Sequence, residues 1–252
     1  MKYKKNILIA GAKGFLGSNL LTKLTRFNNI NIVEFNRNHT FQDLEKIIGS
    51  IEFIYHLAGK VYPKSNDEEF FKGNAGLTKD IIHVIEKKQL SIPFLMASSI
   101  HAELQKNAYG TSKREAEIYL EEYGKRNNVP VWIYRLPHVF GEGCKPNYNS
   151  VISTWLYNSI HNKEIVVFDR SIPMTYVYVQ DLVDEFIDCL NTQHDSTTDC
   201  YCKPKITYDT TLGDVVDYLD EFKNLNTPAS YDEGFKAKLY ATYLDYLNHK
   251  DS

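Results

Sequence analysis

The sequence predicts an α/β fold with a doubly wound parallel sheet, because short apolar runs alternate with longer amphipathic stretches through its first half. A glycine-rich loop joins the first apolar run to the first amphipathic stretch, as in dinucleotide-binding folds. The chain has 252 residues, of which 43% are hydrophobic and 24% are charged. These values are near the averages of globular domains and exclude a disordered, collagen-like or coiled-coil chain.

The first half of the chain has the rhythm of successive βα units. Each predicted strand is a short apolar run, and each predicted helix is a longer stretch with apolar residues on one face. We predict strands over residues 6–10, 30–35, 53–57, 94–98 and 131–135. We predict helices over residues 16–27, 41–48, 67–87 and 109–125.

The rhythm changes after Arg135, where Pro137, Gly141, Gly143 and Pro146 interrupt the chain. The later segments predict helices over residues 150–161, 182–190, 212–222 and 235–247, and short strands over residues 165–168 and 176–179. Residues 1–136 are expected to form a dinucleotide-binding Rossmann domain, and residues 137–252 to complete the same compact unit.

Charge and residue counts exclude several functional classes. The net charge of −3 and the absence of a basic run argue against a nucleic-acid partner. The chain has no run of about 18 apolar residues, so no spanning helix is expected. Its four cysteines and eight histidines lack the spacing of zinc ligands, and we expect no metal and reduced thiols in a cytoplasmic protein.

The loop after the first predicted strand reads Gly-Ala-Lys-Gly-Phe-Leu-Gly, with glycines at positions 11, 14 and 17. Glycine at these positions permits a tight turn and a close approach of the backbone to a pyrophosphate. The following helix N-terminus supplies free N–H groups and a partial positive charge. The alternative is that they are only turn glycines, but the strand, loop and helix context favours a dinucleotide site.

The end of the second predicted strand bears on which dinucleotide binds. An NAD site normally places a carboxylate there, but residues Asn36 and Arg37 follow this strand, and Glu34 lies before its end. Arg37 and Lys13 are two cations that can meet a 2′-phosphate, which favours NADPH. The alternative is that both are solvated surface charges.

Tyr109 and Lys113 lie four residues apart at the start of a predicted helix, ten residues after Ser99. Side chains at this spacing share a helix face, so the Lys113 ammonium is expected to lower the pKa of the Tyr109 phenol. Tyr109 is then a general acid, and Ser99 holds the same substrate oxygen. The same spacing recurs by chance at Tyr201 and Tyr246, but only Tyr109 follows a strand end where such a sheet binds ligands.

Together these motifs make the chain resemble the extended short-chain dehydrogenases, the group of sugar-nucleotide epimerases, dehydratases and reductases. The glycine loop, His56-Leu57-Ala58-Gly59, Asn74, Ser98-Ser99 and Tyr109-x-x-x-Lys113 occur in that order. The resemblance implies an N-terminal domain for NAD(P), a C-terminal region for the nucleotide sugar, and Ser99, Tyr109 and Lys113 as catalytic residues. The implied cofactor-binding residues are Gly11, Lys13, Gly14, Phe15, Leu16, Gly17, Arg37, Leu57, Ala58, Gly59 and Asn74.

Within this family the chain is more similar to reductases of capsular polysaccharide synthesis, above all through residues 141–152 and Ser99-Ile-His-Ala. That resemblance implies NADPH-dependent reduction of the 4-keto group of a UDP-2-acetamido-2,6-dideoxy-hexos-4-ulose, giving a UDP-2-acetamido-2,6-dideoxy-L-talose type sugar. In those enzymes a zinc-dependent cupin epimerase follows the reductase part, and this chain ends where the cupin would begin. We therefore expect a separate cupin epimerase as a partner, and a homodimer.

The chain departs from the family pattern in its second half. His138 stands where an asparagine is common, and Met174 stands where an arginine often contacts the nucleotide phosphate. Arg170 is the expected substitute, with Phe168 stacking on uracil and Asn149 near the diphosphate.

Two other functions remain open from the sequence. An epimerase or dehydratase of the same fold would recycle a tightly held NAD, and a dinucleotide-sensing protein would need no catalytic residues. Asn36 and Arg37 argue against the first of these, and the intact set of Ser99, Tyr109 and Lys113 argues against the second.

Overall fold

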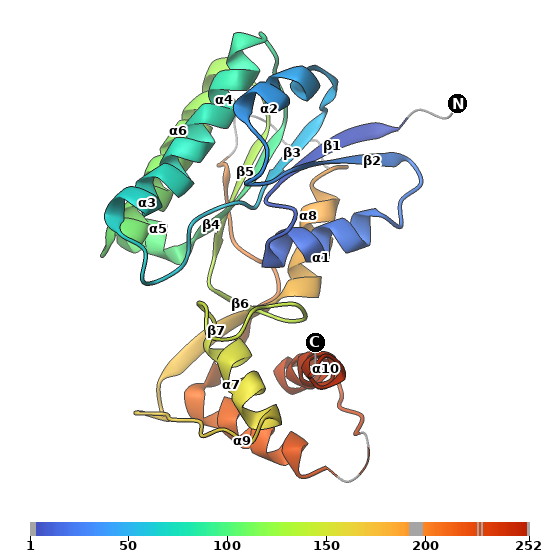
Figure 1. The fold of residues 1–252 in the computed structure, drawn as a ribbon, viewed down its shortest axis with the longest axis vertical. Helices are drawn as coiled ribbons and strands as arrows, with labels where there is room; N and C mark the ends of the chain where they lie inside the picture. The colour runs from blue at the N-terminus through green and yellow to red at the C-terminus, as the bar shows by residue number, and fades with distance from the viewer. Residues whose placement is uncertain (1–3, 192–198, 226, 228, 251–252) are drawn as a thin grey trace. The chain divides into compact units, whose positions relative to one another are not determined.

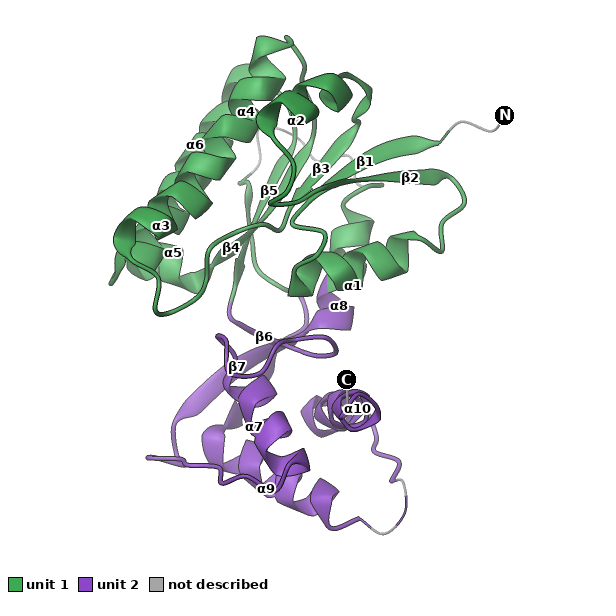
Figure 2. Ribbon diagram, viewed as in Figure 1, with its two compact units in different colours: residues 1–136, 183–204 green, residues 137–182, 205–252 purple. Residues whose placement is uncertain are grey.

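A computed structural model describes residues 4–191, 199–225, 227 and 229–250, and it divides the chain into two compact units. Unit 1 comprises residues 1–136 and 183–204, and unit 2 comprises residues 137–182 and 205–252 (Figure 2). The expectation that residues 137–252 complete one compact unit with the Rossmann domain stays a prediction. The change after residue 136 lies where the composition indicated it, but residues 183–204 return to the first unit.

Unit 1 is built on a six-stranded parallel sheet in the order β2-β1-β3-β4-β5-β8 (Figure 1). The predicted doubly wound α/β fold is confirmed. The strands are β1 Lys5–Ala10, β2 Ile30–Phe35, β3 Phe53–His56, β4 Phe94–Ser99, β5 Val131–Leu136 and β8 Tyr201–Cys202. The chain leaves β1 for β2 on one side and continues with β3 on the other, so the strand order reverses beside β1. A ligand is expected at the carboxyl ends of the strands at such a reversal.

Helices cover both faces of this sheet, because its central strands are apolar on both faces. The helical segments of unit 1 are α1 Phe15–Leu24, α2 Phe41–Ile47, the short 3-10 turn Ile48–Ser50, α3 Asp67–Phe71, a π-helical turn Lys72–Gly76, α4 Leu77–Lys87, α5 Ile100–Leu104 and α6 Ala108–Asn127. Leu44 of α2, Ile81 of α4 and Leu120 of α6 pack with Leu8 and Met96 in one buried cluster. Figure 1 shows α2, α4 and α6 together on this face.

The segment after residue 182 returns to unit 1 because its apolar residues complete the opposite face of the sheet. Helix α8 Val179–Asp188 places Phe186 against Tyr55 and Tyr134, with ring centroids 6.4 Å and 5.0 Å away. The Tyr55 hydroxyl donates a 2.7 Å hydrogen bond to the Phe186 carbonyl. Strand β8 then pairs with β5. Sequence periodicity does not reveal such long-range pairing.

The predicted helix over residues 67–87 is interrupted. Asn66 caps α3 with a reciprocal capping box, and a π-helical turn at Lys72–Gly76 then separates α3 from α4. Gly73 faces Lys60, where an added Cβ would lie 2.8 Å from the Lys60 Cβ. Such turns often occur at functional sites, and this one carries Asn74.

The described residues of unit 2 form a three-stranded sheet that packs with the helices α7, α9 and α10. Its elements are β6 His138–Phe140, β7 Pro173–Tyr178, β9 Tyr208–Thr211, α7 Val151–Ile160, α9 Leu212–Lys223 and α10 Phe235–Asn248. The sheet order is β6-β7-β9, with β6 parallel and β9 antiparallel to β7. Its core gathers Phe140, Trp155, Tyr176, Leu219 and Tyr240.

The strand predicted over residues 165–168 was wrong. Ile165 and Val167 pack partly against the core of unit 2, while Val166 and Phe168 are exposed, so the alternation is real. No strand among the described residues hydrogen-bonds with this segment, and alternation alone does not make a strand. The sequence also did not predict β6, β9 or α5, which are each at most five residues long.

Candidate active site

The loop between β1 and α1 has the close backbone contacts that its glycines predicted. Gly11 has φ +88°, and a Cβ there would lie 2.6 Å from the Ala58 backbone nitrogen. A Cβ on Gly17 would lie 2.1 Å from the Gly11 carbonyl oxygen. Gly14 is the N-cap of α1 and provides no side-chain cap. The N-terminus of α1 at Phe15 and Leu16 therefore keeps the open, positive character that a pyrophosphate needs.

Asn36 connects this loop to the end of β2. Its Oδ1 accepts a 3.1 Å hydrogen bond from the Lys13 backbone N–H, and its Nδ2 donates at 3.0 Å to Glu34 Oε2. The side chains of Lys13 and Arg37 are exposed. Asn36 is thus a site residue whose structural role the sequence reasoning missed. Its position directly after a strand was the available signal.

The segment Leu57–Gly59 after β3 lies between the glycine loop and the side chains of Asn74 and Lys113. Leu57 continues the strand by donating its N–H to the Ala10 carbonyl at 2.9 Å, and Ala58 contacts Gly11 as described. A Cβ on Gly59 would lie 2.9 Å from Asn74 Oδ1 and 3.8 Å from Lys113 Nζ. This segment therefore brings the predicted cofactor loop next to the predicted catalytic lysine.

Asn74 holds this segment in place from the π-helical turn. Its Oδ1 accepts from the Lys60 N–H at 2.8 Å, and its Nδ2 donates to the Lys60 carbonyl at 3.1 Å and to Ser112 Oγ at 3.0 Å. Asn74 is 2% exposed. It therefore connects the loop after β3 to helix α6 rather than extending into solvent.

Ser99 and Tyr109 lie on successive elements. Ser99 ends β4 and caps α5, where its Oγ accepts from the His101 N–H at 3.2 Å. Tyr109 lies in the first turn of α6, and its ring packs edge-on against Phe70 and His101 at 5.7 Å and 5.9 Å. Helix α5 fills the gap between the two residues, which the sequence left unassigned.

The pKa of Tyr109 differs from the expectation. Burial raises the pKa of this phenol above its ordinary value, and a hydrogen bond with the Ser99 side chain lowers it by less. The Lys113 Nζ donates a 2.7 Å hydrogen bond to the Ala97 carbonyl of β4. The expected lowering of the pKa of Tyr109 by Lys113 was therefore wrong for this structure, because desolvation is the larger effect.

Lys113 is itself perturbed. Its side chain is 5% exposed, and burial lowers its pKa from 10.5 to about 8, while the charge of Glu117 acts in the opposite direction. Burial also lowers the pKa of His56 to about 3, so the neighbouring imidazole is neutral. Glu117 is a further site residue that the sequence reasoning missed, although it lies one helical turn beyond Lys113 on the same face.

The residues expected to bind substrate lie in unit 2. Asn149 is exposed, and Phe168 is fully exposed. Arg170 Nη2 donates to Asp217 Oδ1 at 2.6 Å and to the Gly213 carbonyl at 3.2 Å. Arg170 is therefore held by α9. Of the two departures from the family pattern, His138 is exposed in β6 and Met174 is half-buried in β7.

The described ranges contain neither a metal-ligand cluster nor a membrane-spanning helix. No group of three or more His, Cys, Asp or Glu side chains there is placed to hold a metal ion. No helix within the same ranges combines the length and apolar character that crossing a membrane requires.

The chain is similar to known proteins over most of its length. The profile of the NAD dependent epimerase/dehydratase family matches residues 7–199. A UDP-2-acetamido-2,6-beta-L-arabino-hexul-4-ose reductase of Pseudomonas aeruginosa is 36% identical over 244 residues, which cover 96% of this chain and 64% of that protein. This chain thus spans less than two thirds of that relative.

Solved structures have a fold similar to that of this chain. The capsular polysaccharide assembling protein CapF from Staphylococcus aureus superposes with a TM-score of 0.81 at 36% identity, covering 98% of this chain and 67% of CapF. A UDP-glucose 4-epimerase from Thermotoga maritima has the same TM-score at 17% identity, with 98% of this chain and all of that chain covered, and shows a shared fold.

Proposed function

Because the chain belongs to the NAD dependent epimerase/dehydratase family, we propose that it is an NADPH-dependent reductase of a nucleotide sugar. Its proposed substrate is a UDP-2-acetamido-2,6-dideoxy-hexos-4-ulose, whose 4-keto group it reduces to give a UDP-2-acetamido-2,6-dideoxy-L-talose type sugar for surface polysaccharide. The observation that carries this proposal is the similarity to a reductase of such a 4-keto sugar over 96% of the chain.

The pKa of Tyr109 supports its role as the acid in a reduction. A phenol whose pKa is raised by burial stays protonated near neutral pH, and it can donate its proton to the oxygen of the former keto group. Ser99, which hydrogen-bonds with Tyr109, holds the same oxygen. Burial keeps the resting Tyr109 phenol protonated, and we assign to the Lys113 ammonium, one helical turn away, the role of opposing the desolvation of the tyrosinate only after the proton has left.

The glycine loop supports a dinucleotide beside these residues. The backbone of Ala58 lies too close to Gly11, and the Gly11 carbonyl too close to Gly17, for either glycine to carry a Cβ. The N-terminus of α1 lacks a side-chain cap. Gly14, Phe15, Leu16 and the backbone of Leu57, Ala58 and Gly59 would line the cofactor, and Asn74 would support that loop. When bound, NADPH supplies the hydride.

The exposed cations Lys13 and Arg37 support a preference for NADPH over NADH. Among the described residues, neither side chain has a hydrogen bond or an ion pair, and both are exposed. Both are thus available to a 2′-phosphate near the end of β2.

In unit 2, Asn149, Phe168 and Arg170 are proposed to bind the nucleotide part of the substrate. The full exposure of Phe168 suits a residue that stacks on a uracil ring. Arg170 would exchange its contact with Asp217 for a phosphate oxygen. We further propose a cytoplasmic homodimer that receives its substrate from a separate cupin epimerase.

The decisive experiment follows NADPH oxidation by its loss of absorbance. It uses purified protein and a UDP-4-keto sugar. We expect stoichiometric loss of NADPH and a 4-hydroxy product. An epimerase or dehydratase would instead convert a UDP-sugar with no net change in cofactor, which would contradict the proposal. The Tyr109→Phe variant is the control for catalysis by this site.

A further inference from the structure

The buried carboxylate of Glu117 lies on helix α6, one turn beyond the proposed catalytic residue Lys113. We propose that Glu117 is a positioning residue, whose negative charge keeps the Lys113 ammonium protonated and whose hydrogen bonds hold α6 against the strand end that carries Ser99. This inference rests on the proposed role of Lys113.

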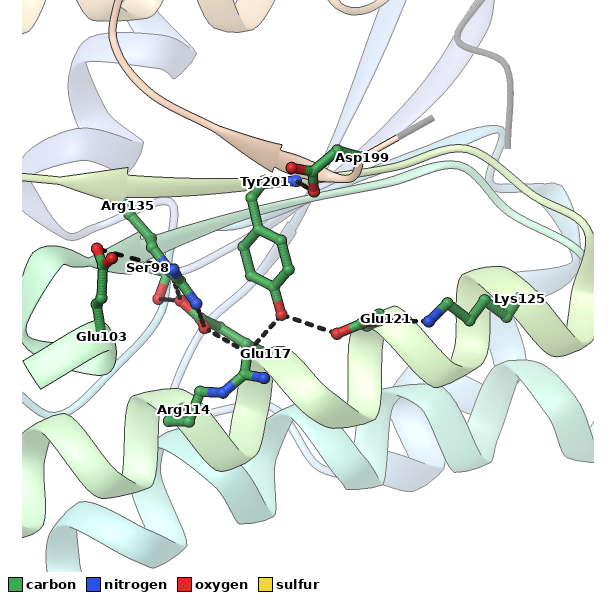
Figure 3. Close-up of polar contacts among 9 residues, drawn as sticks. All are labelled: Ser98, Glu103, Arg114, Glu117, Glu121, Lys125, Arg135, Asp199 and Tyr201. Carbon is green, nitrogen blue, oxygen red and sulfur yellow. Dashed lines mark hydrogen bonds and ion pairs between the residues drawn. The ribbon is translucent and has the colours of Figure 1, made fainter. Parts of the chain in front are cut away.

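All the acceptor positions of the Glu117 carboxylate are used. Its side chain is fully buried, and its Oε1 accepts from Ser98 Oγ at 2.6 Å and from Arg135 Nε at 3.1 Å. Its Oε2 accepts from Arg135 Nη2 at 2.8 Å and from Arg114 Nη1 at 3.0 Å (Figure 3). Three of these four bonds come from the guanidinium groups of Arg114 and Arg135, which are charge-assisted donors matched to a carboxylate.

A second layer of contacts surrounds the two arginines. The Tyr201 ring of β8 lies 4.2 Å from the Arg135 guanidinium, and its hydroxyl accepts from Arg114 and donates to Glu121 at 2.8 Å (Figure 3). Glu103 of α5 lies 3.8 Å from Arg135 but is mostly exposed. Glu103 and Glu121 are each partly exposed, so Glu117 is the fully buried anion among the residues of this cluster.

The spacing places this anion beside Lys113. Residues four apart on a helix share a face, and Lys113 and Glu117 are both buried on α6. The Lys113 ammonium bonds the Ala97 carbonyl of β4, interacts electrostatically with the neutral His56 of β3, and lies one turn beyond Tyr109 on α6. The cations of this region, Arg114 and Arg135, are bonded to Glu117 itself. Glu117 is accordingly the charged group that opposes the desolvation of Lys113.

The test measures the titration of Lys113 without requiring turnover. Protein labelled with carbon-13 at the lysine Cε is titrated by NMR, and the Lys113 signal is assigned by its loss in Lys113→Met. In the wild type we expect a pKa of about 8. In Glu117→Gln, which keeps the shape and removes the charge, we expect that pKa to fall by about 1 or more.

Two further variants separate electrostatics from structural damage. Glu121→Gln removes an anion one turn farther along α6 and should leave the pKa of Lys113 unchanged. Arg114→Gln breaks the same cluster as Glu117→Gln but removes a cation, so the pKa of Lys113 should stay or rise. A purely structural role would make both cluster variants shift the pKa in one direction.

The outcomes decide the inference independently of the proposed reaction. A folded Glu117→Gln protein with an unchanged Lys113 pKa overturns it, with folding checked by circular dichroism. If Glu117→Gln does not fold, a fall in the pKa with Arg114→Gln overturns it, and an unchanged or raised value supports it. Failure of the wild type to oxidise NADPH would contradict the proposed function and leave this titration result standing.

Discussion

The Lys113 ammonium donates a 2.7 Å hydrogen bond to the backbone carbonyl of Ala97, two residues before Ser99. This contact fixes the lysine of helix α6 against strand β4, and a Cβ on Gly59 would come within 3.8 Å of the same nitrogen. The buried lysine therefore lies where helix α6, strand β4 and the loop of the proposed cofactor site meet.

The lowered pKa of Lys113 predicts a loss of activity at alkaline pH. The ammonium is the active form, so activity should be constant below its pKa of about 8 and fall as pH rises through that value. An ordinary lysine would lose its proton only near pH 10.4, about two units higher. The measurement is kcat against pH at saturating substrate. A profile that stays flat to about pH 10 would contradict this role.

Tyr109→Phe should abolish reduction while sparing cofactor binding, because the hydroxyl serves as an acid and the ring still packs on Phe70. Loss of the general acid should lower kcat about a hundredfold or more. Ser99→Ala should give a smaller but measurable defect. Turnover of Tyr109→Phe within about tenfold of the wild type would refute the assignment. NADPH binding is checked by fluorescence.

Arg37→Ala should raise the KM for NADPH far more than the KM for NADH, because only NADPH has the 2′-phosphate. Arg26→Ala, at another exposed arginine beyond the end of α1, is the matched control and should change neither value. Wild-type protein that uses NADH as well as NADPH would show that Arg37 does not select the cofactor.

Gly11→Ala should destroy dinucleotide binding. Gly11 has φ +88°, and an added Cβ would lie 2.6 Å from the Ala58 nitrogen, so the loop or the segment after β3 must move. Gly49→Ala is the control, because nothing lies within 4 Å of its added Cβ. Isothermal titration with NADPH measures the difference. Equal affinity in the two variants would mean that this loop does not bind the cofactor.

The proposed division of labour predicts metal-independent reduction of an already epimerised sugar. The protein should oxidise NADPH with the epimerised UDP-4-keto sugar and not with its unepimerised precursor. A chelator should leave the rate unchanged, since the proposed chemistry uses only a phenol, a hydroxyl and an ammonium. Equal turnover of the precursor, or inhibition by the chelator, would assign a further step to this protein.

The sequence alone was sufficient for the five main strands of unit 1. β2 was predicted at its observed bounds, and the other four main strands were predicted to within one residue at either end, because strands buried on both faces are apolar runs bounded by polar turns. The glycines of the first loop also predicted its geometry. At Gly11 and Gly17 the backbone leaves no room for a side chain, a constraint that acts locally and so leaves a local signature.

Tertiary structure alone decided the remaining features. The return of residues 183–204 to the first sheet depends on contacts such as that between Tyr55 and Phe186, which are 131 residues apart. The direction of the pKa shift at Tyr109 and the buried position of Glu117 depend on how much water the surrounding elements exclude. Desolvation and long-range pairing arise only when distant segments pack together, so one-dimensional periodicity cannot encode them.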